Sequence, residues 1–191
     1  LEISRLTLQG TALAVERAFD GNFRLQNIPE NNSETTFLPE DVPPIEILIM
    51  DSSVTYEDPI LGIAWRFQNV RAEFSKSLDG IALEARADAP EELGGLVEVS
   101  AEVGLLDDQT ESERNWRLFG EIRDFDLAVL PILVSEPKLS SVVGVGDIDV
   151  WLDMTGFHAN QGTMQLALTD VGLGNGEIAD YDSFGLTAEW V

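Results

Sequence analysis

The chain of 191 residues carries 35 acidic and 11 basic side chains, a formal net charge of −24, and 44% of its residues are hydrophobic. The hydrophobic share is large enough for a folded core. The acidity argues against nucleic acid and against docking onto an anionic membrane surface, because both need a basic patch. The chain contains no cysteine, which excludes disulfides, iron–sulfur clusters and thiol catalysis.

The chain begins at Leu1 without a Met or a signal peptide. Its longest apolar run, residues 127–134 with Pro131 inside it, is far shorter than the ~20 residues of a membrane-spanning helix. We therefore expect the chain to be a fragment of a longer protein, with any membrane anchor outside it.

The first part of the chain contains short strand-like segments and a proline-rich loop. Residues 1–10 and 22–28 are typical of strands, whereas residues 11–19 fit either a helical turn or a further strand. Residues 29–44 hold four prolines among polar residues, which predicts a surface loop. We expect residues 1–44 to be the end of a preceding β repeat plus this loop.

From residue 45 onward, apolar and polar residues alternate, which places one set on each face of a strand. Residues 45–58 predict two strands that meet at Asp51-Ser52-Ser53. Further strand patterns follow over residues 62–70, 80–89, 95–103, 115–125 and 181–191. One short helix is expected near residues 126–134, where Asp126 would be its N-cap.

The longest pattern is a hairpin over residues 142–173. Its first arm, residues 142–155, would span roughly 45 Å at about 3.3 Å per residue, well beyond a typical strand. The GFHANQG segment at residues 156–162 predicts the loop between the arms. About ten to twelve strands with at most one or two short helices make the fold class all-β, with long antiparallel amphipathic strands over residues 45–191.

The sequence contains no recognisable catalytic or metal site. Its one histidine, His158, falls in the expected hairpin loop without ligand spacing around it. Asp147, Asp149 and Asp153 share a strand face, but neighbours on one face are about 6.6–7 Å apart, too far for one Ca²⁺ without other ligands. We expect no enzyme activity, no cofactor and no metal.

Two architectures would use the shared apolar face. In a sandwich, two such faces cover each other. In a single bent sheet, the face would line a groove open to lipid. Patterning alone favours the sandwich.

Six short motifs occur in an order that resembles the YhdP branch of the AsmA-like family. They are DSSVTYED at 51–58, FQNV at 67–70, APEELGG at 89–95, NWRLFG at 115–120, FDLAVL at 125–130 and GVGDIDVWL at 144–152. The resemblance covers roughly residues 45–173. Tyr56, where the family commonly has Trp, and Phe119, near which it has Tyr, are departures.

The resemblance implies a periplasmic protein tethered to the inner membrane through a segment outside this chain. It implies a curved, groove-like (β-taco) sheet that conducts phospholipid between inner and outer membranes and supports the outer-membrane barrier. The partners would be phospholipid or another acyl-chain lipid, and neighbouring repeats of the same full-length chain. The family has no catalytic residues to transfer.

This resemblance favours the groove over the sandwich. We expect the lining to consist of Ile63, Trp65, Phe67, Ile81, Leu83, Val97, Val99, Leu118, Ile148, Val150, Leu152, Met154, Leu166 and Leu168. Two rival hypotheses are a structural or adhesin-like β-sandwich module with no lipid cargo and a carbohydrate-binding β domain. The second would need its tryptophans on one surface, and Trp65, Trp116, Trp151 and Trp190 are scattered along the chain.

Overall fold

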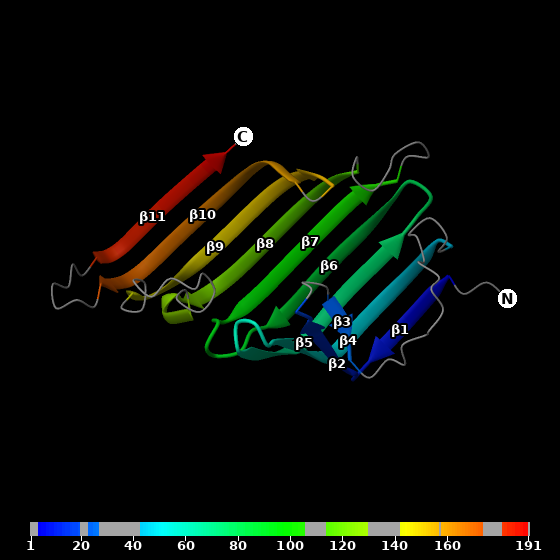
Figure 1. The fold of residues 1–191 in the computed structure, drawn as a ribbon, viewed down its shortest axis with the longest axis horizontal. Helices are drawn as coiled ribbons and strands as arrows, with labels where there is room; N and C mark the ends of the chain where they lie inside the picture. Colours follow the sequence, from blue (N-terminus) through cyan, green and yellow to red (C-terminus); the bar gives the residue numbers. More distant parts are fainter. Residues whose placement is uncertain are drawn as a thin grey trace.

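The protein forms one open, curved sheet of 11 strands in a computed structural model (Figure 1). The structure describes residues 4–19, 23–26, 43–105, 114–129, 142–156, 158–173 and 181–190. Over these residues it contains strands and one short 3₁₀ turn, and no second sheet covers the first. The predicted all-β, groove-like fold is confirmed, and the sandwich is wrong.

The strands follow one another across the sheet almost in sequence order. They are β1 (Arg5–Gln9), β2 (Ala12–Arg17), β3 (Phe23–Leu25), β4 (Ile45–Asp58), β5 (Ile63–Lys76), β6 (Gly80–Asp88), β7 (Leu96–Gly104), β8 (Asn115–Asp126), β9 (Val142–Thr155), β10 (His158–Leu173) and β11 (Tyr181–Trp190). From β4 to β11 each strand pairs antiparallel with the next. β1 and β2 both pair parallel with β4, one after the other along it, and β3 pairs with β2.

Several strand boundaries differ from the expectations. Residues 45–58 form a single strand rather than two. For residues 11–19, where both a helical turn and a strand were open, residues 12–17 form a strand. The expected loop over residues 156–162 is wrong from His158 onward, because β10 begins there. The predicted first arm, residues 142–155, matches β9.

The expected helix near residues 126–134 is described only in its first turn. Residues 127–129 form the 3₁₀ turn η3 (Leu127–Val129). Asp126 caps it as predicted, because its carboxylate accepts a hydrogen bond of 2.9 Å from the backbone N–H of Ala128. Residues 130–134 lie outside the described part of the chain.

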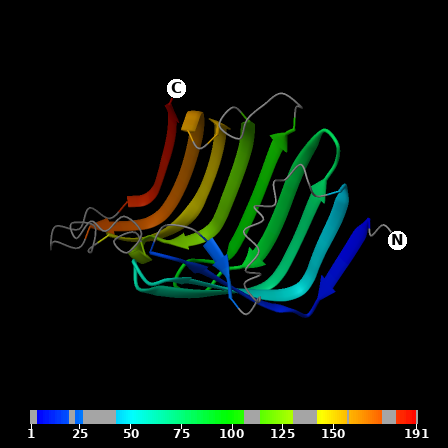
Figure 2. The ribbon, with the colours of Figure 1, turned by 45° about the vertical axis from the view of Figure 1, so that its right-hand side comes forward.

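The sheet bends along a line that crosses several strands, as Figure 2 shows. On this line Asp51, Asn69, Asp124 and Asp170 have left-handed backbone conformations, with φ between 49° and 53°. Each coincides with a shift in strand register, the mark of a β-bulge. Asp and Asn are the non-glycine residues that adopt this conformation most readily, so the bulges need no glycine.

Each bulge inserts one residue and so shifts the alternation of side chains. In β5, Trp65 and Phe67 precede the bulge and Val70 and Ala72 follow it, and all four lie on one face. Residues 67–70 of β5 form a four-residue pattern: an apolar residue, any residue, Asp or Asn, and then the next residue on the same face. This pattern recurs at 49–52, 122–125 and 168–171. The bulge therefore bends the strand while keeping its apolar residues on one side.

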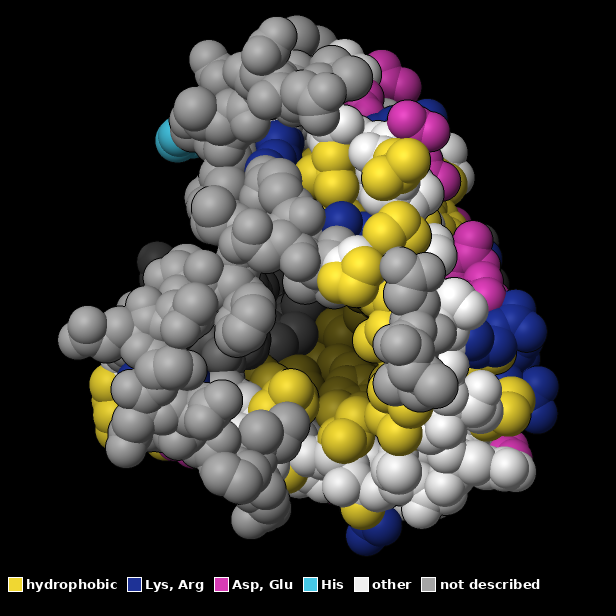
Figure 3. All heavy atoms as spheres, turned by 90° about the vertical axis from the view of Figure 1, so that its right-hand side faces the viewer, with side chains coloured by type: hydrophobic (Ala, Val, Ile, Leu, Met, Phe, Trp, Pro, Cys, Tyr) yellow, Lys and Arg dark blue, Asp and Glu magenta, His cyan; other side chains and the backbone are white. Residues whose placement is uncertain are grey.

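The two faces of the sheet differ in chemistry. Figure 3 shows a hollow lined by hydrophobic side chains, with charged side chains on the outer surface. We call these the inner and the outer face.

A buried cluster fills the bend. Leu93, Phe125, Leu127, Val129 and Leu168 are each at most 6% exposed and pack together. The loop that carries Leu93 is fixed to β8, since Leu93 accepts a hydrogen bond from the N–H of Asp126 (3.3 Å) and Gly95 donates one to the carbonyl of Arg123 (2.9 Å). This bend core closes the inner face at the bend; Val103 of β7, on the same face but outside this cluster, is also buried.

We expect the bulge at Asp170 to tolerate glycine but not a β-branched residue. Asp170→Val should lower the free energy of unfolding by about 1–2 kcal/mol, because valine is strained at positive φ. Asp170→Gly should leave it unchanged or slightly higher. Urea denaturation of both variants measures this, and equal stability of the two would contradict the role of the backbone conformation.

Candidate functional site

All of the lining residues predicted from the sequence lie on the inner face, because paired residues of neighbouring strands point to the same side of a sheet. For example, five inner-face residues on neighbouring strands pair one with the next: Phe74, Leu83, Ala101, Leu118 and Leu152. The predicted residues on it are Ile63, Trp65 and Phe67 of β5, Ile81 and Leu83 of β6, Val97 and Val99 of β7, Leu118 of β8, Ile148, Val150, Leu152 and Met154 of β9, and Leu166 and Leu168 of β10. That they line a lipid path stays a prediction.

Further apolar residues of the inner face were not among those predicted, and about half of them follow a bulge or belong to the short strands β1 and β2. They are Leu6 and Leu8 of β1, Leu13 and Val15 of β2, Ile47, Ile49 and Val54 of β4, Val70, Ala72 and Phe74 of β5, Trp116, Gly120 and Ile122 of β8, Met164 of β10, and Leu186, Ala188 and Trp190 of β11. The shift of the alternation at Asp or Asn is the sequence signal that would have found those of β4 and β5.

The predicted residues divide into two groups by their surroundings. Trp65, Phe67, Val97, Ile148, Leu166 and Leu168 belong to or pack against the bend core. Val99, in the middle of the sheet, is 40% exposed although it lies on the inner face. A valine in an ordinary core would be almost fully covered. The inner face is therefore filled at the bend and open at Val99, whereas Val103, farther along β7, is 3% exposed.

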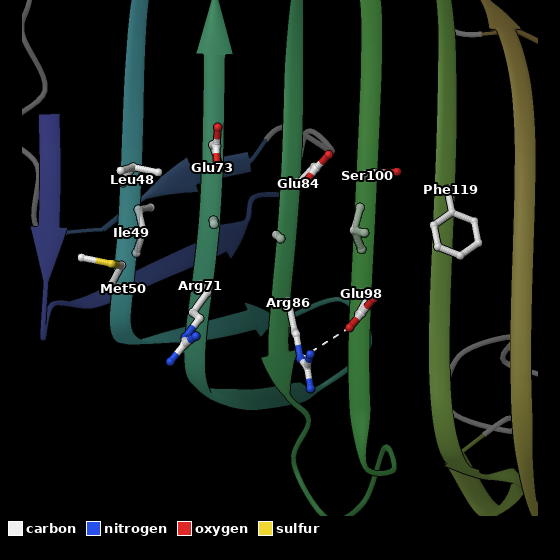
Figure 4. A pocket seen from close by; sticks show the side chains of 13 residues that line it. Leu48, Ile49, Met50, Arg71, Glu73, Glu84, Arg86, Glu98, Ser100 and Phe119 are labelled. Carbon is white, nitrogen blue, oxygen red and sulfur yellow. Dashed lines mark ion pairs between the residues drawn. The ribbon is translucent and has the colours of Figure 1, made fainter. Parts of the chain in front are cut away.

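The outer face carries charges that pair with one another in water. Figure 4 shows a shallow depression on it, where Arg71, Arg86 and Glu98 lie on three neighbouring strands. Arg86 and Glu98 form an ion pair of 3.4 Å. Arg71 stands directly opposite Arg86, an unfavourable pairing that exposure to water weakens. Such exposed ion pairs contribute little stability, about 0–1 kcal/mol each.

The far end of the inner face holds a buried carboxylate. Asp58 is fully buried and accepts hydrogen bonds from the Tyr56 hydroxyl (3.0 Å), from Arg17 (3.1 Å) and from the N–H groups of Ile60 and Leu61 (2.9 and 3.0 Å). Burial alone would raise the pKa of Asp58, but these hydrogen bonds together outweigh it and lower the pKa. Asp58 thus joins β2 to β4 and closes the turn after β4, as its position at a strand end suggests.

The acidic residues and the histidine considered for metal binding or catalysis do not lie on the apolar inner face with the predicted lining residues. Asp147 and Asp149 both pair with Arg123 on the outer face, at 3.4 and 3.2 Å, and Asp153 accepts a hydrogen bond from Gln161. Among the described residues, no group of acidic or histidine side chains has the arrangement of a metal site. His158 is exposed at the start of β10.

The four tryptophans do not form one cluster, because three lie on the inner face in strands that are not neighbours and one lies on the outer face. Trp65, Trp116 and Trp190 lie on the inner face in β5, β8 and β11. Trp151 lies on the outer face, where its ring contacts that of Phe119 at a centroid distance of 5.3 Å. The carbohydrate-binding hypothesis therefore lacks the cluster of exposed tryptophans it requires.

Comparison of the chain with family models, curated proteins and solved structures finds no match. In the described part of the chain, no helix is long and apolar enough to cross a membrane.

Asp58 should make the stability depend on pH at the acid end. Its pKa is lower in the folded than in the unfolded chain, so its contribution is complete above about pH 4 and is lost as the pH falls through the folded-state value. Asp58→Asn should therefore be less stable than the parent at pH 7, by a margin that shrinks on acidification. Urea denaturation between pH 7 and pH 2.5 measures this margin, and a margin independent of pH would contradict the assignment.

The two parts of the inner face should respond differently to a new charge. Leu166→Asp should lower the free energy of unfolding by at least about 2 kcal/mol, because the carboxylate enters the bend core. Val150→Asp should cost less than about 1 kcal/mol if its side chain reaches water in the open stretch. Denaturation curves of the two variants compare them directly, and equal losses would mean that Val150 belongs to a closed core.

Proposed function

We propose that this chain is a section of a lipid-conducting groove, not an enzyme, and that its inner face carries the acyl chains of phospholipid. The observation that carries the proposal is the open apolar stretch around Val99, 40% exposed in the middle of an 11-stranded sheet. Leaving such a surface to water costs about 25 cal/mol per Å² of apolar area. A hydrophobic ligand that covers it would remove this cost.

The size of the cargo favours a continuous surface over separate pockets. At about 0.8 kcal/mol per buried CH₂, a phospholipid with about thirty methylenes gains on the order of 20 kcal/mol from leaving water. The inner face offers continuous rows of apolar side chains that run across the strands, such as the row from Phe74 to Leu152. The charged outer face suits contact with water on the other side of the same sheet.

The open edges of the sheet fit a repeating conduit. Among the described strands, β11 pairs only with β10, and β1 pairs only with β4. An open strand edge is a template for pairing with a further strand. Neighbouring sections of a longer chain would extend the groove at these edges, in the periplasmic, inner-membrane-tethered setting that the resemblance to the AsmA-like proteins implies.

Native mass spectrometry of the purified chain, with extraction and identification of bound lipid, tests the proposal. We expect phospholipid to co-purify with the parent chain. Val150→Asp should lose most of it while keeping the fold, because a carboxylate on the inner face opposes hydrocarbon. Thr187→Asp, which adds the same charge to the outer face of β11, is the matched control and should keep its lipid.

A parent chain that carries no lipid, and takes up none from phospholipid vesicles, would contradict the proposal. Equal lipid loss in Val150→Asp and Thr187→Asp would point to net charge rather than to the inner face.

A further inference from the structure

The N-terminal strands are attached to the sheet through β4 alone. β1 and β2 pair parallel with the two halves of β4, and β3 pairs only with β2 among the described strands. From β4 to β11 every pair is antiparallel, and parallel pairs are slightly less stable per residue. We call residues 4–19 and 23–26 the strap, which lies at the edge of the sheet opposite to β11 (Figure 1).

The strap follows β4 across the bend. Gly10, with a φ of 66°, lies between β1 and β2 and beside the bulge at Asp51. Its N–H group donates to the carbonyl of Met50 (3.0 Å), and the N–H group of Ser53 donates to the carbonyl of Thr11 (2.9 Å). β1 and β2 thus act as one bent strand along the 14 residues of β4.

The strap buries little apolar surface. Ala18 is the only buried residue among its described side chains, whereas Leu6, Phe19 and Leu25 are 42%, 81% and 50% exposed. None of its described residues belongs to the bend core or packs against it. Because apolar burial supplies most of the stability of a fold, we expect the strap to have lower local stability than the strands around the bend core.

Two ion pairs link the strap to β4. Arg5 pairs with Glu46 at 2.6 Å and Arg17 pairs with Asp58 at 3.1 Å. The first pair lies on the surface and contributes little. Release of Arg17 would not leave the buried Asp58 without partners, because the Tyr56 hydroxyl and two backbone N–H groups also donate to its carboxylate.

The second buried polar group of β4 has the same property. The hydroxyl of Ser52 lies 2.9 Å from that of Thr11, but it also donates to the carbonyl of Met50 within β4 (2.8 Å). Removal of a strand is most unfavourable where it orphans a buried polar group. At Ser52 and Asp58, β4 keeps hydrogen bonds of its own when the strap leaves.

The strap also determines the length of the sheet edge. With the strap in place, the edge consists chiefly of the five residues of β1 and the three of β3. Such short edge strands are poor templates for a further strand. β4 without the strap would offer an edge of 14 residues.

We propose that the strap opens and closes as one unit while β4 to β11 stay folded, and that it thereby controls whether β4 presents its long edge. The opening itself does not depend on lipid. Its use rests on the proposed function, in which a strand of a neighbouring section would pair with the uncovered β4 and extend the groove.

Amide hydrogen exchange of the parent chain, followed by NMR, tests the opening. We expect the amides of β1 and β2 to be protected at least about tenfold less than those of β6 to β8. The N–H groups of Glu46 and Ser53 belong to β4 but donate to the strap carbonyls of Ser4 and Thr11, at 2.9 Å each. They should therefore show the low protection of the strap.

A disulfide between strap and β4 should abolish the separate opening. Thr11→Cys combined with Ser52→Cys places two thiols where the hydroxyls lie 2.9 Å apart, in a chain with no other cysteine. Oxidation should raise the protection of the strap and of Glu46 by at least about tenfold more than that of β6 to β8. The reduced form of the same variant is the matched control and should open as readily as the parent.

A second variant loosens the strap. Arg17→Met removes the link to Asp58 and should lower the protection of β2 by about threefold or more, with β6 to β8 unchanged. Arg117→Met removes an ion pair of 2.6 Å with Glu102 outside the strap and should leave the strap unchanged.

Equal protection of β1, β2 and β6 to β8 in the parent chain would overturn the inference, because the strap would then open only with the whole sheet. High protection of Glu46 and Ser53 beside an unprotected strap would overturn it as well. If the cysteine variant does not fold, the comparison within the parent chain decides. A parent chain that binds no lipid would remove the proposed function and leave the exchange result as it is.

Discussion

The structure depends on bending long strands without turning their apolar side chains outward. The bulges at Asp51, Asn69, Asp124 and Asp170 do this by inserting one residue in a left-handed conformation. Without the inserted residue, the alternation would place every later apolar residue on the opposite face. A sheet with four such bulges on one line can curve around its apolar face over the whole length of the strands.

The bend also determines where the inner face is closed. Leu93 and η3 fill the bend at β6 to β10, held there by backbone hydrogen bonds to β8. Away from the bend, no described element covers the face, and Val99 remains exposed. A packed core along the bend thus lies beside the exposed Val99 on one face of the sheet. Under the proposed function, the core would provide stability and the exposed stretch would receive lipid.

The alternation predicted the fold class well, whereas the curvature of the sheet was expected only from the family resemblance. Alternation in β6, β7, β9 and β10 was long enough to identify the strands and their inner residues. The position of the bend within the strands was not predicted, because one inserted Asp or Asn breaks the alternation locally and resembles a turn, as it did at Asp51. Whether another layer covers the apolar face depends on contacts between strands that are far apart in the sequence. Alternation within one strand carries no information about such contacts, and only the family resemblance favoured the open form.

A crystal structure of the chain purified together with phospholipid would test the central claim most directly. The account predicts hydrocarbon density along the inner face, away from the bend core, with the strands curved as in Figure 2. An inner face covered by a second protein layer, from this chain or from another copy, with no hydrocarbon between the layers, would contradict it.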